Sequence, residues 1–166
     1  MGPLDITDKK ILNLLQKNSG QSIKEIADKI GLSVSPTYER IKQLERAGVI
    51  LGYVALLDKS KIEKELVAVC NIKLKEHSQS TLSKFEKAIV KFDEVMEVLC
   101  LSGDVDYSIK VVTKDMKSYQ DFIMHKISSV ENIANVQSYF MIKEIKSTTA
   151  FKLIWYRYAG FSYFLR

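Results

Sequence analysis

Two short stretches carry side chains whose types and spacing suit binding chemistry. The first is residues 33–50, "SVSPTYERIKQLERAGVI". A helix here turns hydroxyl, amide and charged groups to one side, at 100° per residue. Serine, threonine, glutamate and glutamine near a helix start can meet base edges, and basic residues one turn on can meet phosphates. The candidate DNA-binding residues are Ser33, Ser35, Pro36, Thr37, Glu39, Arg40, Lys42, Gln43 and Arg46.

The second stretch is residues 101–108, "LSGDVDYS". Gly103 and Asp104 suit a two-residue hairpin turn, because glycine adopts positive φ without steric cost. The carboxylates of Asp104 and Asp106 could bind an ammonium group, while turn amides could bind a carboxylate. Turns are rich in glycine and aspartate in any case, so an ordinary polar hairpin tip explains the same residues.

Three helices are predicted to position the first stretch. One runs from about residue 7 to residue 17, and a second begins at a capping box formed by Ser22 and Glu25. The third begins at Ser33 or Ser35 and ends at Gly48. Its core side carries Val34, Ile41 and Leu44, with Thr37 and Tyr38 near the margins. Two helices joined by about three residues predict a helix-turn-helix.

A helix-turn-helix is consistent with DNA binding without establishing it. Its second helix fits the major groove, and its small N-terminal residues allow close approach. Residues 1–60 carry only a slight excess of basic residues, so a dimer that presents two such helices is expected. Three-helix units with charged outer faces also occur in proteins that bind no nucleic acid.

The second half predicts a ferredoxin-like βαββαβ domain, which makes the fold class α+β. Its expected strands are residues 66–74, 95–101, 107–113 and 136–145, and its expected helices are residues 80–92 and a helix capped by Asp115. Both helices should cover one face of an antiparallel sheet, and a second subunit would cover the other. The β-prone run 49–57 could form a wing or a strand that leaves the first domain, with a linker at 58–61.

Composition narrows the class of protein. The chain has 166 residues, a net charge of +5 and 46% hydrophobic residues, which permits a polyanionic partner and a packed core. Cys70 and Cys100 lie in apolar runs and predict buried thiols in a reducing compartment. Without a signal peptide or a membrane-spanning run, a cytoplasmic protein is expected. His77 and His125 share no metal-ligand spacing, and no catalytic motif appears, so no enzyme and no cofactor are predicted.

Several motifs together resemble the leucine-responsive/asparagine-regulator (Lrp/AsnC) family of transcription regulators. In the first half they are Leu4-Asp5, Asp8, Ile11-Leu12, Gly31-Leu32-Ser33, Arg40-Ile41, Leu44-Glu45, Gly48-Val49-Ile50 and Tyr53. In the second half, residues 103–107, "GDVDY", are similar to the family's Gly-Asp-aromatic-Asp-Tyr loop. The resemblance covers about residues 4–151, with the two halves in the family's order.

The resemblance implies a particular assembly and a particular ligand. It implies a homodimer built through the ferredoxin-like domains, often assembled further into octamers, with winged or plain helix-turn-helix domains on palindromic DNA. It also implies an amino-acid-like effector bound where subunits meet. By position, the effector-binding residues would be Gly103, Asp104, Asp106 and Tyr107, with Tyr139 and Met141 on the last strand as further candidates.

Three departures from the family pattern stand out. Val105 replaces the loop aromatic, which predicts a pocket of different shape, and Gln21 replaces a common arginine, which predicts that one phosphate contact is missing. The chain also continues as residues 151–166, "FKLIWYRYAGFSYFLR". That tail could add a strand, pack at an interface, contact a membrane surface or be an appended segment.

The sequence therefore predicts four segments and one leading function. The segments are a helix-turn-helix domain at 1–52, a linker strand at 53–61, a ferredoxin-like domain at 62–150 and an aromatic tail at 151–166. The leading function is a DNA-binding transcription regulator that responds to an amino-acid-like effector. The alternative is a metabolite-sensing or protein-interaction module whose helical domain does not bind DNA.

Overall fold

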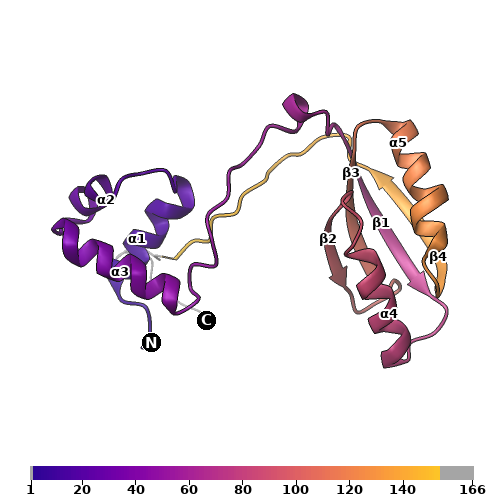
Figure 1. The fold of residues 1–166 in the computed structure, drawn as a ribbon, viewed down its shortest axis with the longest axis horizontal. Helices are drawn as coiled ribbons and strands as arrows, with labels where there is room; N and C mark the ends of the chain where they lie inside the picture. Colours follow the sequence, from indigo (N-terminus) through magenta and orange to yellow (C-terminus); the bar gives the residue numbers. More distant parts are fainter. Residues whose placement is uncertain (1, 154–166) are drawn as a thin grey trace, which may run out of the picture. The chain divides into compact units, whose positions relative to one another are not determined.

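The chain forms two compact units, seen in a computed structural model that describes residues 2–153 (Figure 1). One unit contains the chain up to Ala55 together with the segment that begins at Lys146, and the other runs from Leu56 to Ile145. The second domain was predicted to end at residue 150. It ends instead at Ile145, because the segment that begins at Lys146 groups with the N-terminal helices. Residues 154–166 of the predicted tail lie outside the described residues.

The N-terminal unit is built from three helices around a small apolar core. They are α1 (Ile6–Lys17), α2 (Ile23–Ile30) and α3 (Val34–Arg46). Each helix contributes a fully buried side chain, and these are Ile11, Ile26 and Leu44. The helix-turn-helix prediction for α2 and α3 agrees with this arrangement.

Local capping sets where α1 and α2 begin and end. Ser22 and Glu25 form the predicted capping box, and Asp5 and Asp8 form a second one at the start of α1. Gly31 ends α2 in the left-handed region, with φ of 75°. Because only glycine adopts this conformation without steric cost, the tight turn into α3 depends on that residue.

The connections between the units contain no strand within the described residues. In the single chain, the run 49–57 expected to form a wing or a departing strand has no partner strand, and the expected linker at 58–61 enters a short 3₁₀ turn, η1 (Lys59–Ile62). A linker strand over 53–61 stays a prediction. The returning segment is fastened to α1 through one side chain. Nε2 of Gln16 donates to the carbonyl of Phe151 over 3.2 Å, and the Phe151 amide donates to Oε1 over 2.6 Å. Leu153 then packs against the N-terminal core.

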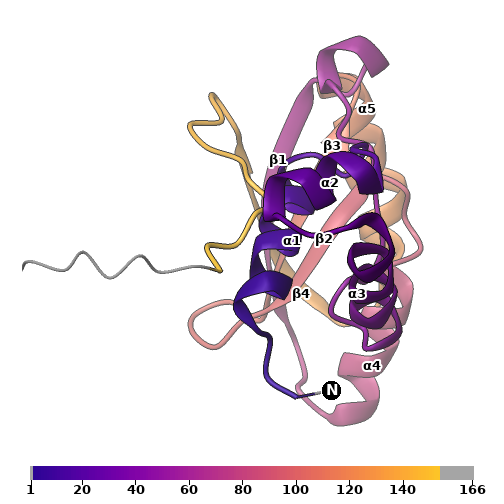
Figure 2. The ribbon, with the colours of Figure 1, turned by 90° about the vertical axis from the view of Figure 1, so that its left-hand side faces the viewer.

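The second unit is the predicted ferredoxin-like domain. Its strands are β1 (Leu66–Leu74), β2 (Val95–Cys100), β3 (Tyr107–Thr113) and β4 (Ile133–Phe140), antiparallel in the order β2-β3-β1-β4 (Figure 1). Its helices are α4 (Gln79–Ile89) and α5 (Met116–Asp121), and α5 continues through η2 (Phe122–Lys126) and η3 (Ile127–Ser129). Figure 2 shows α4 and α5 on the same side of the sheet.

The last strand lies earlier in the chain than the sequence predicted. The expected range was 136–145, whereas β4 is Ile133–Phe140. The register with β1 explains the shift, because Leu74 pairs with Ile133 and Ala68 with Phe140. After the Met141 amide donates to the carbonyl of Val67, β1 offers almost no further backbone to pair with.

Alternation along the strands separates a packed face from an open face. Cys70, Ile72, Ile109 and Val111 face the helices and are fully buried. Cys70 is thus the buried thiol that was expected, and its Sγ lies 3.2 Å from the Tyr119 hydroxyl. Cys100 is exposed, contrary to prediction, because it ends the edge strand β2.

We expect Gly31→Ala to lower the free energy of unfolding by about 1 kcal/mol, because alanine is strained at positive φ. A Cβ at Gly31 would meet no atom within 4 Å, so backbone strain is the whole expected effect. Gly52→Ala is the matched control, since a Cβ there would also meet nothing and its φ is not in the left-handed region. Equal urea-unfolding midpoints for the two variants would contradict the argument.

Candidate nucleic-acid interface and ligand loop

Helix α3 presents most of its predicted binding face to solvent. Ser33, Ser35, Pro36, Glu39 and Gln43 are exposed. Ser33 is the N-cap residue but makes no side-chain hydrogen bond to the first turn. Helix N-terminal amides that lack a side-chain cap are suited to anions such as phosphate. The start of α3 therefore combines small side chains with available backbone donors.

Thr37 does not belong to the exposed face. Its side chain is fully buried, and its hydroxyl donates to the Ser33 carbonyl over 2.9 Å. It stands four residues before Ile41 and seven before Leu44, which places it on the helix's core stripe. Val34 was predicted to face the core but is 47% exposed, because the first turn of α3 extends beyond the packed helices. Tyr38, predicted at the margin, is 42% exposed. Both add apolar surface that the periodicity did not predict.

Arg40 fastens α3 to the start of α1. Its Nη1 lies 2.7 Å from a carboxylate oxygen of Asp5 and 2.7 Å from one of Asp8. The hydrogen bond from the Asp8 amide is the largest cause of the lowered pKa of the Asp5 carboxyl; desolvation opposes it, and the Arg40 guanidinium lowers the pKa further. Hydrogen bonds to the two carboxylates raise the pKa of Arg40. This geometry supports a role in orienting the helix.

The two basic residues farther along α3 have weak partners of their own. Nζ of Lys42 lies 2.7 Å from Glu45, and Nη2 of Arg46 lies 3.9 Å from Glu39. Tyr53 also donates to Glu45 over 3.0 Å, and burial together with that bond raises the pKa of Tyr53 to about 12. Exposed ion pairs contribute about 0–1 kcal/mol, so both cations can exchange partners at little cost.

Gln21, at a position where the family commonly has arginine, forms hydrogen bonds within the N-terminal unit. Its Nε2 donates to the carbonyls of Leu14 and Asn18 over 3.2 and 2.7 Å. Its Oε1 accepts from Lys29. Gln21 therefore ties the end of α1 to α2, and the expected absence of a phosphate contact at this position stays a prediction.

The predicted ligand loop is the hairpin between β2 and β3. Gly103 has φ of 151°, and the carboxylate of Asp104 is exposed. Asp106 is turned back onto its own sheet, because its Oδ2 accepts from the Leu74 amide over 2.7 Å. Its Oδ1 lies 2.9 Å from Nε2 of His77. Asp106 is thus an anchor of the hairpin, whereas Asp104 has no hydrogen bond or ion pair to any described residue.

Tyr107 is not available at the loop surface. Its side chain is buried among the helix-facing residues, with its ring 4.7 Å from that of Phe85. Its hydroxyl donates to Glu86 on α4 over 2.7 Å. Burial and this hydrogen bond raise the pKa of Tyr107. The β3 register thus turns Tyr107 toward the core of this chain, and its role in a ligand site stays a prediction.

The remaining predicted ligand residues lie at the other end of the sheet. Tyr139 pairs with Val69, and Met141 follows the end of β4 and bonds Val67. The hairpin joins β1 at Ile72, where the Asp106 amide donates to its carbonyl. Along β1, Ile72 is three residues from Val69 and five from Val67, or roughly 10 Å and 17 Å. One chain therefore does not bring Tyr139 and Met141 together with Asp104.

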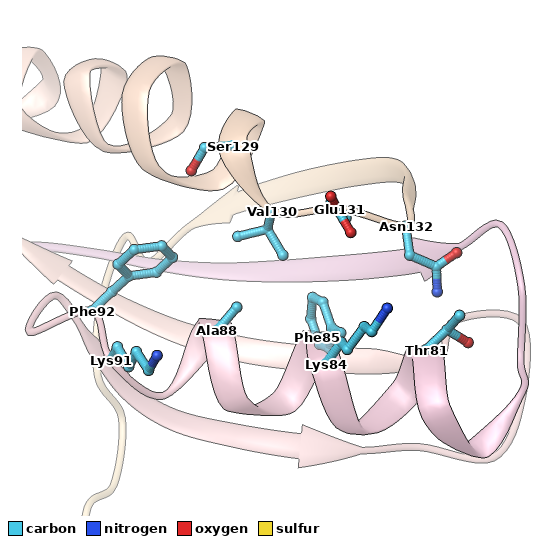
Figure 3. Close-up of a pocket in the computed structure, with 10 residues that line it drawn as sticks. All are labelled: Thr81, Lys84, Phe85, Ala88, Lys91, Phe92, Ser129, Val130, Glu131 and Asn132. Carbon is cyan, nitrogen blue, oxygen red and sulfur yellow. The ribbon is translucent and has the colours of Figure 1, made fainter.

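A separate hollow of about 470 Å³ lies between α4 and residues 129–132 (Figure 3). Phe85, Ala88 and Val130 point into it. None of the predicted ligand residues lines it. At one end, Asn132 forms two hydrogen bonds with the backbone of Glu76, over 2.8 and 2.9 Å. This end of the hollow therefore shares a wall with the loop that carries His77.

Comparison with known families agrees with both halves of the fold. A family model described as the Lrp/AsnC ligand binding domain matches residues 67–151. A second, described as a winged helix-turn-helix DNA-binding domain, matches residues 4–50. The chain belongs to the Lrp/AsnC family.

Curated relatives of this Lrp/AsnC chain are transcription regulators. The DNA-binding transcriptional activator DecR of Escherichia coli K12 is 35% identical over 147 residues, which are 89% of this chain and 97% of DecR. The leucine-responsive regulatory protein of Rhizobium meliloti is 35% identical over 143 residues, which are 86% of this chain and 92% of that protein. This chain is a DNA-binding transcription regulator of the Lrp/AsnC type.

Solved structures of family members share the fold. An AsnC family transcriptional regulator from Agrobacterium tumefaciens is 38% identical with a TM-score of 0.86, over 90% of this chain and 97% of that one. The transcriptional regulator NMB0573 from Neisseria meningitidis, solved as a complex with L-Met, is 33% identical with a TM-score of 0.87, over 91% and 97%.

Two features are absent from the part of the Lrp/AsnC chain that the structure describes. Within residues 2–153, no helix has the length and apolarity needed to cross a membrane. In the same described range, no group of three or more histidine, cysteine, aspartate or glutamate side chains is arranged to hold a metal ion.

We expect Arg40→Met to lower the stability of the N-terminal unit and to weaken its acid dependence. Because the folded state lowers the pKa of Asp5, its stabilising effect is full above the unfolded value of about 4 and is lost as the pH falls through the lower folded value. Thermal unfolding followed from neutral pH to about pH 3 measures this loss. Lys24→Met, on the exposed side of α2, is the control, and an identical acid profile for wild type and Arg40→Met would contradict the role of Arg40.

Proposed function

We propose that this regulator binds a palindromic operator as a homodimer, with α3 as the reading helix, and that an amino-acid-like effector alters this binding. The observation that carries the proposal is the exposed, small-residue start of α3 on a helix held in place by Arg40. Ser35, Pro36, Glu39 and Gln43 would face base edges. Lys42 and Arg46 would exchange their glutamate partners for phosphates.

The open face of the sheet supports a dimer. Val69, Leu99 and Tyr139 are 39%, 46% and 54% exposed on the face away from the helices. A second copy of the chain would bury these apolar groups, each square ångström being worth about 25 cal/mol. In a two-fold interface whose axis runs across the strands, one end of a sheet lies against the opposite end of its partner. Tyr139 and Met141 of one copy could then approach the Asp104 loop of the other.

The effector proposal rests on charge and on a relative. Asp104 offers a carboxylate without an ion-pair partner among the described residues, which suits an ammonium group. The amides of the Gly103 turn could meet a carboxylate. NMB0573, 33% identical, was solved with L-Met, so an α-amino acid is the ligand class we assign here.

Selection from a pool of random duplex DNA, at roughly physiological salt, tests the function. We expect enrichment of a two-fold symmetric site with half-sites about one or more helical turns apart. We also expect the enrichment to change when a mixture of amino acids is added. If no sequence is enriched in either condition, the protein is a metabolite-sensing or protein-interaction module instead.

The same selected DNA separates phosphate-binding residues from base-reading residues. The Lys42→Ala, Arg46→Ala double variant should bind selected and random duplexes more weakly by similar factors. The slope of its log affinity against log salt should flatten by about 0.9 for each phosphate that the variant no longer neutralises. The Lys84→Ala, Lys87→Ala double variant, which removes two exposed lysines of α4, is the charge-matched control. An unchanged salt slope in the double variant would exclude these residues as phosphate ligands.

We expect Val69→Glu to convert the dimer to a monomer, because it places a charge at the centre of the open sheet face. Val90→Glu is the matched control, since Val90 is 64% exposed and ends α4 on the other side. Light scattering coupled to size-exclusion chromatography gives the mass of each. If Val69→Glu stays dimeric on dilution to the same concentration as wild type, this face is not the interface.

A further inference from the structure

His77 is a titratable side chain to which no role has yet been given. It lies between the end of β1 at Leu74 and the start of α4 at Gln79. Its Nε2 lies 2.9 Å from Oδ1 of Asp106, so the imidazole donates a hydrogen bond to that carboxylate. This contact joins two residues 29 positions apart in the sequence, where the β2–β3 hairpin meets the end of β1.

The backbone on either side of His77 is held firmly. Glu76 before it exchanges two hydrogen bonds with the side chain of Asn132, and Asn132 adopts a left-handed φ of 71°. Ser78 after it caps α4 by accepting from the Thr81 amide. Asn132 and Thr81 lie at the same end of the hollow in Figure 3. The imidazole therefore projects from a loop that is fixed at both sides.

Asp106 in turn holds the hairpin against β1. Its amide donates to the Ile72 carbonyl over 3.0 Å, and its carbonyl accepts from the Leu101 amide over 2.8 Å. Its Oδ2 accepts from the Leu74 amide over 2.7 Å, so His77 provides the remaining partner of the carboxylate. The Leu74 amide and then His77 lower the pKa of Asp106. Anything that weakens the bond to His77 loosens one of the attachments of the loop.

We propose that His77 is a positioning residue for the effector loop and makes effector affinity depend on pH. This inference rests on the proposed function, in which Asp104 and the turn amides bind an α-amino acid. Protonated His77 forms a charged pair with Asp106, which holds the Gly103–Asp104 turn in one geometry. Neutral His77 keeps the hydrogen bond but loses the charge, so the loop is held less firmly and the effector binds less tightly.

The surroundings of His77 leave Asp106 as its charged partner. On β1, Lys73 is near enough to act on the Asp106 carboxylate. At the start of α4, Ser78 and Thr81 bond to each other, and Asn132 bonds to the backbone of Glu76, so none of these groups adds a charge beside His77. Glu76 neighbours His77 in the loop but engages Asn132 through its backbone. Imidazole is the ordinary side chain that changes charge between pH 5 and 8.

The test uses the full-length protein, L-methionine as the probe, and calorimetric titrations at about pH 6 and about pH 8. The ammonium and carboxylate of L-methionine keep their charges over this range. We expect wild type to bind several-fold more tightly at the lower pH. His77→Gln, which can still donate to Asp106 but cannot titrate, should bind equally at both pH values. His77→Ala should bind roughly fivefold more weakly than His77→Gln, the effect of one net hydrogen bond.

His125→Gln on η2 is the matched control, and it should keep the wild-type pH dependence. If His77→Gln also keeps it, or if His77→Ala binds as tightly as wild type, the inference is overturned while the proposed function stands. If wild type binds no L-methionine at either pH, the effector part of the proposed function fails for this probe, and the inference fails with it. Hydrogen exchange of the Leu74 amide then decides whether the clamp exists, since His77→Ala should accelerate that exchange and a merely solvated histidine would not.

Discussion

The hydrogen-bond register of β1 is the constraint on which the ligand-binding unit depends. This strand pairs with β3 on one side and β4 on the other, so each residue of β1 fixes a position on both neighbours. A shift of one residue would turn every side chain to the opposite face. The same register buries Tyr107, exposes Val69 and Tyr139, and brings Asp106 to the end of β1. The open face and the anchored hairpin are thus two results of one backbone arrangement.

The N-terminal unit has a much smaller core, in which three helices bury few apolar side chains. In the proposed function, α3 must nevertheless keep a fixed direction if its side chains are to meet base edges. Arg40 provides this direction by binding two carboxylates at the start of α1, one of them largely buried. The Arg40 charge, a DNA-binding candidate in the sequence, is therefore engaged within the protein, whereas Lys42 and Arg46 pair only with glutamates of α3 itself.

Elements specified by local chemistry were predictable from the sequence, and those specified by tertiary packing were not. The capping box at Ser22 and the left-handed Gly31 follow from short-range rules, as does the βαββαβ order. Thr37 is buried although it was predicted on the binding face, and Val34 is exposed although it was predicted on the core side. Periodicity does not say where a helix extends beyond its core. Tyr107 depended on strand register, and Cys100 on its place in an edge strand. His77 had no motif to reveal it, because its partner is 29 residues away.

The contact between Gln16 and Phe151 has a consequence for how the two units are joined. Two hydrogen bonds of about 1 kcal/mol each would not hold a separate peptide on the surface of α1. Here they act together with the packing of Leu153 on the N-terminal core, and attachment costs less because the segment after Lys146 belongs to the same chain. The ligand-binding unit is therefore an insertion between two parts of the helical unit, and the end of β4 leads into a segment already bound to α1.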